Sequence, residues 1–294
     1  MKTTLQPLRG IRVLSLALNL PGPAAVMRLA AMGARCTKFE PLGSAGGSAD
    51  PMAQYRPHAY QTMHQGVRIV AADLKQASGQ KKLHDLLAKT DVLITSFRPS
   101  ALKKLGMDPA QLGKAYPTLI QVSVIGSPPP HAEDPGHDLT YMAECGLVDG
   151  VSLPASLFAD MGGSLMVCET VLKALMWRMQ KKGKGQHHEV ALSDAAAYLG
   201  LPRTWGLTTA DGSVGGAHAG YQVYPCKGGR VAVAALEPHF AQSLCALAGL
   251  PARGDRAHMH SAPVHQALRQ WFAQKTRAQL KRLAQLHDIP MHTL

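Results

Sequence analysis

The feature that most restricts the fold of this chain is an alternation of short strand-like segments with helix-like segments in its first half. The strand-like segments lie at residues 10–16, 36–40, 91–95 and 119–125, and the first of them is a short apolar run. Segments 24–32 and 79–89 have helical spacing, and Gly33 stands where a helix C-cap is expected. Strands that alternate with helices form parallel sheets with crossover helices on their faces. The sequence therefore predicts an α/β fold with a Rossmann-like parallel sheet.

The second half has a different pattern. Helical spacing recurs at residues 137–147, 160–180, 188–201, 238–247, 263–272 and 277–286. Short strand-like runs lie at 221–224 and 230–235. The stretch between these two groups is rich in Gly, Thr and Ala, which is typical of a linker. We predict a large α/β domain over residues 1–202, a linker over 203–220 and a small α+β domain over 221–294.

The composition excludes some classes of protein. Hydrophobic residues make up 46% of the chain and charged residues 17%, which is typical of a folded globular protein. A net charge of +12 favours anionic partners such as nucleic acid, anionic lipid or a phosphorylated ligand. The basic stretches, however, are not interleaved with aromatic residues, and no nucleic-acid-binding module is recognisable. We therefore expect solvated basic surfaces and no nucleic-acid partner.

Cysteine usage and hydropathy suggest the compartment. The five cysteines form no CxxC pair, so neither a disulfide framework nor a zinc site is indicated. No apolar run reaches the roughly 18 residues needed to span a bilayer. We expect a cytoplasmic protein with no membrane association.

Common cofactor and hydrolase motifs are missing from the sequence. There is no GxGxxG after the first apolar run, no GxxxxGK[ST], no HExxH and no GxSxG. The histidines do not have metal-ligand spacing with acidic partners. We expect no metal and no permanently bound cofactor.

Several short segments, in a fixed order, carry a resemblance to a known family. They are residues 8–14 with 21–23, 29–34 with 38–41, 73–75 with 79, 91–99 with 105–106, 136–138 with 159–160, and then 183–186, 215–216 and 236–238. In these segments the chain resembles the class III CoA-transferase family (CaiB/BaiF type), and its Gly136-His137-Asp138 motif looks like that of the α-methylacyl-CoA racemase branch. The resemblance implies an enzyme whose substrate is an acyl-CoA and a homodimer of intertwined subunits.

Family members usually continue beyond the length of this chain, with a C-terminal segment that returns to the large domain. No such segment is present by Leu294. We therefore expect an intertwined dimer that is not fully linked, in which a sheet flank or helix face is left uncovered.

The resemblance also implies that the large domain binds CoA. The expected contacts are Lys38, Asp73, Leu74, Lys75, Ser96, Phe97, Arg98, Lys104 and His137. The chemistry agrees, because CoA phosphates need fixed cations and backbone donors, while adenine needs an apolar slot. Lys38 and Lys104 stand where the family often has arginine, so bidentate phosphate contacts are not expected there. The alternative for each lysine is a solvated surface residue.

Asp160 is the candidate reactive carboxylate. It lies at the predicted start of a helix and precedes Met161-Gly162-Gly163. A helix N-terminus stabilises an anion, and glycines let a thioester approach closely. The alternative is a simple N-cap aspartate.

Two chemistries follow from the resemblance. In the transferase branch, the residue matching Asp160 attacks the thioester and forms an acyl-enzyme anhydride. In the racemase branch, this aspartate and the residue matching His137 exchange protons on opposite faces of the α-carbon, and the residue matching Glu237 pairs with the histidine. Ser156 stands where racemases carry an asparagine.

Proton transfer at the α-carbon of a 2-methylacyl-CoA is the leading hypothesis, because His137 and Glu237 match the racemase branch. CoA transfer between an acyl-CoA and a carboxylic acid is the closest alternative. An inactive CoA-binding homologue is a third.

Overall fold

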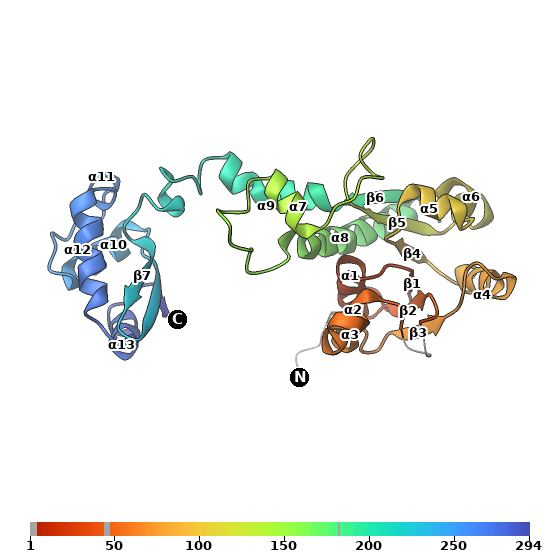
Figure 1. Cartoon of the computed structure of the whole chain (residues 1–294), viewed down its shortest axis with the longest axis horizontal. Helices are drawn as coiled ribbons and strands as arrows, with labels where there is room; N and C mark the ends of the chain where they lie inside the picture. The colour runs from red at the N-terminus through yellow and green to blue at the C-terminus, as the bar shows by residue number, and fades with distance from the viewer. Residues whose placement is uncertain (1–4, 44–47, 182) are drawn as a thin grey trace. The chain divides into compact units, whose positions relative to one another are not determined.

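The computed structural model describes residues 5–43, 48–181 and 183–294. The chain divides into two compact units, Met1–Gly200 and Leu201–Leu294 (Figure 1). Each unit has its own sheet and its own hydrophobic core.

In the described part of the first unit, six strands form one sheet in the order β3-β2-β1-β4-β5-β6, and every neighbouring pair is parallel. The strands are β1 (Arg12–Ser15), β2 (Arg35–Glu40), β3 (Arg68–Ala71), β4 (Val92–Thr95), β5 (Ile120–Ile125) and β6 (His187–Ala191). This is the strand order of a doubly wound dinucleotide-binding sheet. The predicted Rossmann-like parallel sheet is confirmed.

The central strands are buried from both sides. All residues of β4 and β5 are buried, as expected for parallel strands that helices cover on both faces. In the sequence, β4 is an apolar run that ends at Thr95, whereas β5 combines Ile and Val with the buried polar residues Gln121 and Ser123.

Two strands differ from the sequence-based expectation. Residues 188–201 were predicted to be helical, but β6 occupies the first part and helix α9 (Leu192–Thr204) follows without a break. Strand β3 was not predicted. Both lie at sheet edges and have few buried residues. Strand β3 nevertheless contains the short apolar run Ile69-Val70-Ala71. Pairing with β5 and β2 makes them strands.

Helices cover both faces of this sheet. They are α1 (Pro21–Ala31), α2 (Pro51–Tyr55), α3 (Pro57–Met63), α4 (Ala77–Leu87), α5 (Pro99–Lys104), α6 (Pro109–Ala115), α7 (Asp138–Glu144) and α8 (Phe158–Gln180). One core contains residues of α1 and α8, such as Leu29 and Val171, together with β-strand residues such as Val122. A second core contains residues of α4 and α5, such as Leu83 and Leu102.

Helix α1 approaches the end of β1 closely. A Cβ at Gly22 would lie 2.2 Å from the Cβ of Ala17. Glycine is therefore required for the turn that leads from β1 into α1. Gly33, with φ of +96°, follows the last turn of α1, as the sequence predicted.

The second unit has a small antiparallel sheet, β7-β8-β9, in its described residues. Its strands and helices are β7 (Tyr221–Cys226), β8 (Gly229–Ala234), β9 (Met291–Thr293), η2 (Ser213–Gly215), α10 (Pro238–Leu247), α11 (Arg256–Met259), α12 (Ala262–Ala273) and α13 (Arg277–Leu286). Tyr224, Val231 and Phe272 belong to the core shared by the sheet and the helices. The predicted small α+β fold is confirmed.

Among the described residues, no helix is both long enough and apolar enough to cross a membrane. All five cysteines are free thiols, and three of them are buried. Burial raises the pKa of Cys36 to about 12, so this thiol is protonated and unreactive near neutral pH.

Candidate active site

A cavity of about 640 Å³ lies at the carboxyl edge of the parallel sheet in the first unit. Its walls include the loop after β1, Ser96 and Arg98 after β4, and Gly126 after β5. The strand order reverses between β1 and β4, and doubly wound folds bind ligands in the crevice at such a point. The Leu18 N–H donates to Ser96 Oγ at 3.1 Å and joins these two walls.

Asp160 lies in the first turn of α8 and lines this cavity. Its backbone N–H donates to Oδ1 of Asp138 at 3.0 Å. Burial, reinforced by the neighbouring negative charge of Asp138, raises the pKa of Asp160 to about 6. A carboxyl group with such a pKa can hold or release a proton near neutral pH.

His137 is the N-cap residue of α7 and lines the same cavity. Its backbone N–H donates to Thr140 Oγ1 at 3.1 Å, and the Thr140 hydroxyl donates to the His137 carbonyl at 2.8 Å. These bonds fix the start of α7. The fold therefore brings His137 and Asp160 together at one cavity, from the first turns of two packed helices.

Tyr141 forms part of the cavity wall and explains why glycine is needed at Gly126 and Gly136. A Cβ would lie 2.4 Å from the Tyr141 hydroxyl oxygen at Gly136 and 2.3 Å from it at Gly126. Both positions therefore need glycine if the buried Tyr141 ring is to remain in place. The glycine of the Gly136-His137-Asp138 motif makes room for the wall of the site.

The predicted CoA contacts are distributed along the carboxyl edge of the sheet. Ser96, Arg98 and His137 line the cavity. Asp73, Leu74 and Lys75 form the turn after β3, where Asp73 Oδ1 accepts the Lys75 N–H at 2.9 Å. Lys104 is exposed at the end of α5.

Phe97 lines a separate cavity of about 270 Å³, together with Lys103, Ser123 and His187. The Ser123 hydroxyl and His187 Nε2 are 3.0 Å apart. None of the other predicted site residues lines this second cavity.

Lys38 requires a correction. Its side chain is 1% exposed and forms ion pairs with Asp50 and with Glu40, the latter at 3.3 Å. A buried ammonium that balances two buried carboxylates has no surface to offer a CoA phosphate. Asp50 also accepts the Asn19 N–H at 3.1 Å, so this buried network supports the loop that lines the cavity. The sequence did not reveal this role, because the partners of Lys38 are identified by tertiary contacts.

Glu237 belongs to the second unit, where it is exposed and forms the N-cap of α10. Its pairing with His137 stays a prediction.

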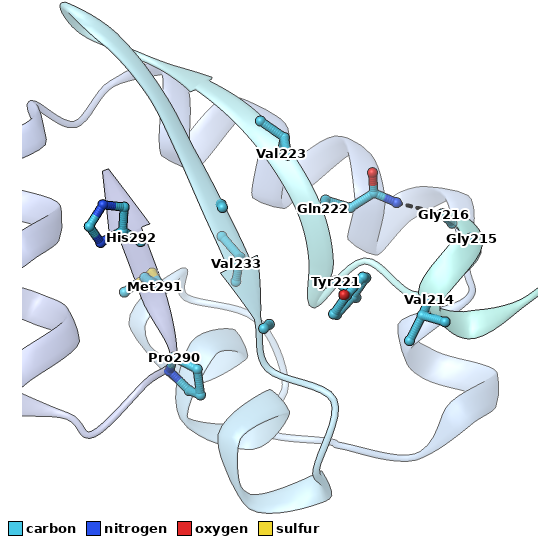
Figure 2. Close-up of a pocket in the computed structure, with 12 residues that line it drawn as sticks. Val214, Gly215, Gly216, Tyr221, Gln222, Val223, Val233, Pro290, Met291 and His292 are labelled. Atoms are coloured by element: carbon cyan, nitrogen blue, oxygen red, sulfur yellow. Dashed lines mark hydrogen bonds between the residues drawn. The ribbon is translucent and has the colours of Figure 1, made fainter. Parts of the chain in front are cut away.

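The second unit contains a cavity of about 570 Å³ on its sheet (Figure 2). Tyr221, Val223 and His292 are among its lining residues, together with Gly215 and Gly216, which belong to the family-like segments. None of the predicted site residues lines it.

Asp138 belongs to the Gly136-His137-Asp138 motif but was not predicted to be a site residue, and no role was predicted for Tyr141. Their signal in the sequence was proximity to His137.

In residues 5–43, 48–181 and 183–294, no group of three or more His, Cys, Asp or Glu side chains could hold a metal ion.

Comparisons with known proteins identify the family of the chain. The family model described as CoA-transferase family III matches residues 8–294. Alpha-methylacyl-CoA racemase from Mus musculus is 29% identical over 292 residues, which cover 92% of this chain and 73% of the racemase. Cinnamoyl-CoA:phenyllactate CoA-transferase from Clostridium sporogenes is 29% identical over 208 residues, which cover 65% of this chain and 50% of the transferase.

Solved structures show the same fold. A hypothetical protein from Mycobacterium tuberculosis superposes with a TM-score of 0.82 at 25% identity, covering 98% of this chain and 85% of that one. A CaiB/BaiF family protein from Brucella suis superposes with a TM-score of 0.79 at 25% identity, covering 98% and 83%. Because racemases and CoA-transferases both occur among the relatives, they do not determine the reaction. The family model nevertheless spans nearly the whole sequence, and the chain belongs to CoA-transferase family III.

Proposed function

We propose that this protein catalyses proton transfer at the α-carbon of a 2-methylacyl-CoA and thereby interconverts its epimers. The observation that carries the proposal is that His137 and Asp160 line one cavity from the starts of two packed helices. Racemisation needs two proton-carrying groups that act on opposite faces of one carbon. This pair supplies them.

The thioester makes the reaction accessible to such groups. Its carbonyl acidifies the α-proton, and removal of that proton leaves an enolate. One member of the pair takes the proton, and the other returns a proton to the opposite face. Because the pKa of Asp160 is raised to about 6, both of its protonation states are present near neutral pH. We propose that Glu237 pairs with His137 and orients its ring.

CoA is proposed as part of the substrate, with no resident cofactor. Exposed Arg98, Lys75 and Lys104 are the candidate phosphate contacts, because they present free cations at or near the carboxyl edge of the sheet. Further contacts are proposed for Asp73, Leu74, Ser96 and Phe97 in the turns after β3 and β4. The free cysteines favour a cytoplasmic location.

The direct test follows α-deuterium incorporation into a 2-methylacyl-CoA in D₂O. We expect Asp160→Asn and His137→Gln each to reduce exchange by about a hundredfold or more, which is a typical contribution of a general acid or base. Asp134→Asn is the matched control, because Asp134 lines the same cavity but pairs with His131 at 2.8 Å. Unchanged exchange in both site variants would contradict the proposal.

CoA transfer to a carboxylic acid is the second candidate. It is favoured by the position of Asp160, which lines the cavity, and by the CoA-transferases among the relatives. In that reaction the Asp160 carboxylate displaces the CoA thiolate from the acyl group and forms an anhydride. Transfer to an added acid that survives His137→Gln but not Asp160→Asn would support this candidate over the racemase.

A further inference from the structure

The buried carboxylate of Asp138 lies beside the candidate reactive residue Asp160. Asp138 is the first residue of α7 and is 5% exposed. Its Oδ1 accepts the backbone N–H of Asp160 at 3.0 Å. Among the ion pairs of the described residues, none involves Asp138 or Asp160. A buried carboxylate is costly without a compensating cation.

We propose that Asp138 is a positioning residue for Asp160: its carboxylate anchors the first turn of α8 and sets a second negative charge beside the reactive carboxyl group. The proposal rests on the proposed function of Asp160 as a proton carrier. It adds a residue that acts through Asp160.

The anchoring role follows from the packing. Tyr141 and Met142 of α7 form a small core with Ala159 of α8, and Ala159 is fully buried beside Asp160. The hydrogen bond from Asp160 to Asp138 lies at the end of this core, where the two helices begin. The first turn of α8 is therefore held against α7 both by apolar packing at Ala159 and by the Asp138 carboxylate at Asp160.

The charge role follows from the surroundings of Asp160. The titratable and charged groups that share its cavity are Tyr55, Arg98, Asp134, His137, Asp138 and Tyr141. Of these, Asp138 contributes to the raised pKa of Asp160, after the larger effect of burial. Burial is the main cause of the raised pKa values of Tyr55 and Tyr141, and the charge of Asp160 adds to both. A second negative charge makes Asp160 retain its proton to higher pH and so makes it available as an acid.

Two variants separate the roles. Asp138→Asn keeps the side-chain volume and an oxygen that can accept the Asp160 N–H, but removes the charge. Asp138→Ala removes both. Asp134→Asn is the matched control, because it removes a carboxylate charge from the same cavity that does not bond to Asp160.

The experiment is a ¹³C NMR titration of the Asp160 carboxyl group in the full chain, assigned by comparison with Asp160→Asn. We expect the wild-type midpoint near pH 6, a lower midpoint in Asp138→Asn and an unchanged midpoint in Asp134→Asn. An Asp138→Asn midpoint equal to that of wild type would overturn the charge role. If Asp134→Asn lowered the Asp160 midpoint by the same amount, the effect could not be assigned to the charge of Asp138.

A second readout uses catalysis. The limb of the pH profile of α-deuterium exchange that reports the ionisation of Asp160 should move to lower pH in Asp138→Asn, with CoA affinity unchanged. In Asp138→Ala, kcat should fall at least tenfold, and asparagine should restore most of it. Equal kcat in Asp138→Ala and wild type would overturn the anchoring role. If the wild-type protein catalyses no exchange, the proposed function fails, while the NMR titration still decides the role of Asp138.

A measurement on the wild-type protein covers the case in which the Asp138 variants do not fold. The Asp160 amide proton should be shifted downfield and protected from solvent exchange, because a carboxylate accepts it. An amide that exchanges as fast as an exposed one would overturn the proposal.

Discussion

At the scale of single residues, Asp160 makes stability depend on pH. Its folded-state pKa is about 6, above the ordinary value of 3.8, so the folded protein holds this proton more tightly than the unfolded chain. The resulting stabilisation is present at low pH and is lost as pH rises through 6. We expect Asp160→Asn to raise the free energy of unfolding at pH 7.5 relative to wild type, by up to about 3 kcal/mol, and to lose this advantage near pH 4. Urea denaturation of both proteins at the two pH values measures this difference in the free energy of unfolding. The same difference between variant and wild type at both pH values would contradict the prediction.

Lys38 provides a second prediction at this scale. Lys38→Met would leave Asp50 and Glu40 buried without their cation. We expect a loss of about 3–5 kcal/mol in the free energy of unfolding, because a buried charge without its partner is strongly destabilising. Lys81→Met is the control, since Lys81 and Asp85 form an exposed pair one helical turn apart, typically worth less than about 0.5 kcal/mol. Equal midpoints for the two variants in urea would show that the buried network does not stabilise the fold.

At the scale of elements, the turn from β1 into α1 depends on one glycine. Gly22→Ala would place a Cβ 2.2 Å from that of Ala17, and we expect it to cost about 1–3 kcal/mol through overpacking. Gly113→Ala in α6 is the matched helix substitution, because the nearest atom, Nε2 of Gln121, would be 3.7 Å away. That variant should be neutral or gain up to about 1 kcal/mol from higher helix propensity. Thermal unfolding distinguishes the two, and a melting temperature raised by Gly22→Ala would refute the packing argument.

At the scale of the whole molecule, α8 exposes an apolar face. The exposed apolar side chains recur three or four residues apart in part of this helix and are Phe158, Met161, Leu165, Met176 and Met179. Its opposite face is buried in the core through residues such as Val167 and Val171. An exposed apolar helix face opposite a buried one is expected to be covered, although α8 also carries the exposed ion pair Glu169–Lys173. This apolar face supports the predicted homodimer.

Sedimentation velocity tests this expectation. We expect the wild-type protein to sediment as a dimer, and Met176→Lys with Met179→Lys to shift it towards monomer, because these side chains are 64% and 84% exposed. Leu286→Lys is the control, since it replaces an exposed leucine on the polar helix α13. A monomeric wild-type protein would contradict the prediction.

Much of the fold could be predicted because it depends on local patterns. Strand β4 is an almost continuous apolar run, and β5 is rich in Val and Ile. Helix α13 was predicted with its observed bounds, since its cap at Thr276 and its apolar spacing are contained in a few adjacent residues. The family could be recognised because short motifs occur in a fixed order along the chain. The same motifs singled out His137 and Asp160.

The tertiary structure decided the features that depend on contacts between distant segments. The edge strands β3 and β6, in which few residues are buried, are defined by their pairing with β2 and β5. Lys38, a surface candidate by residue type, is buried because its strand and the start of α2 place carboxylates around it. Asp138 meets Asp160 because α7 packs against α8. By itself, the sequence determined the elements and the chemical groups of this protein; the burial and pairing of those groups were decided by the packing of segments far apart in the chain, because a local pattern does not contain that information.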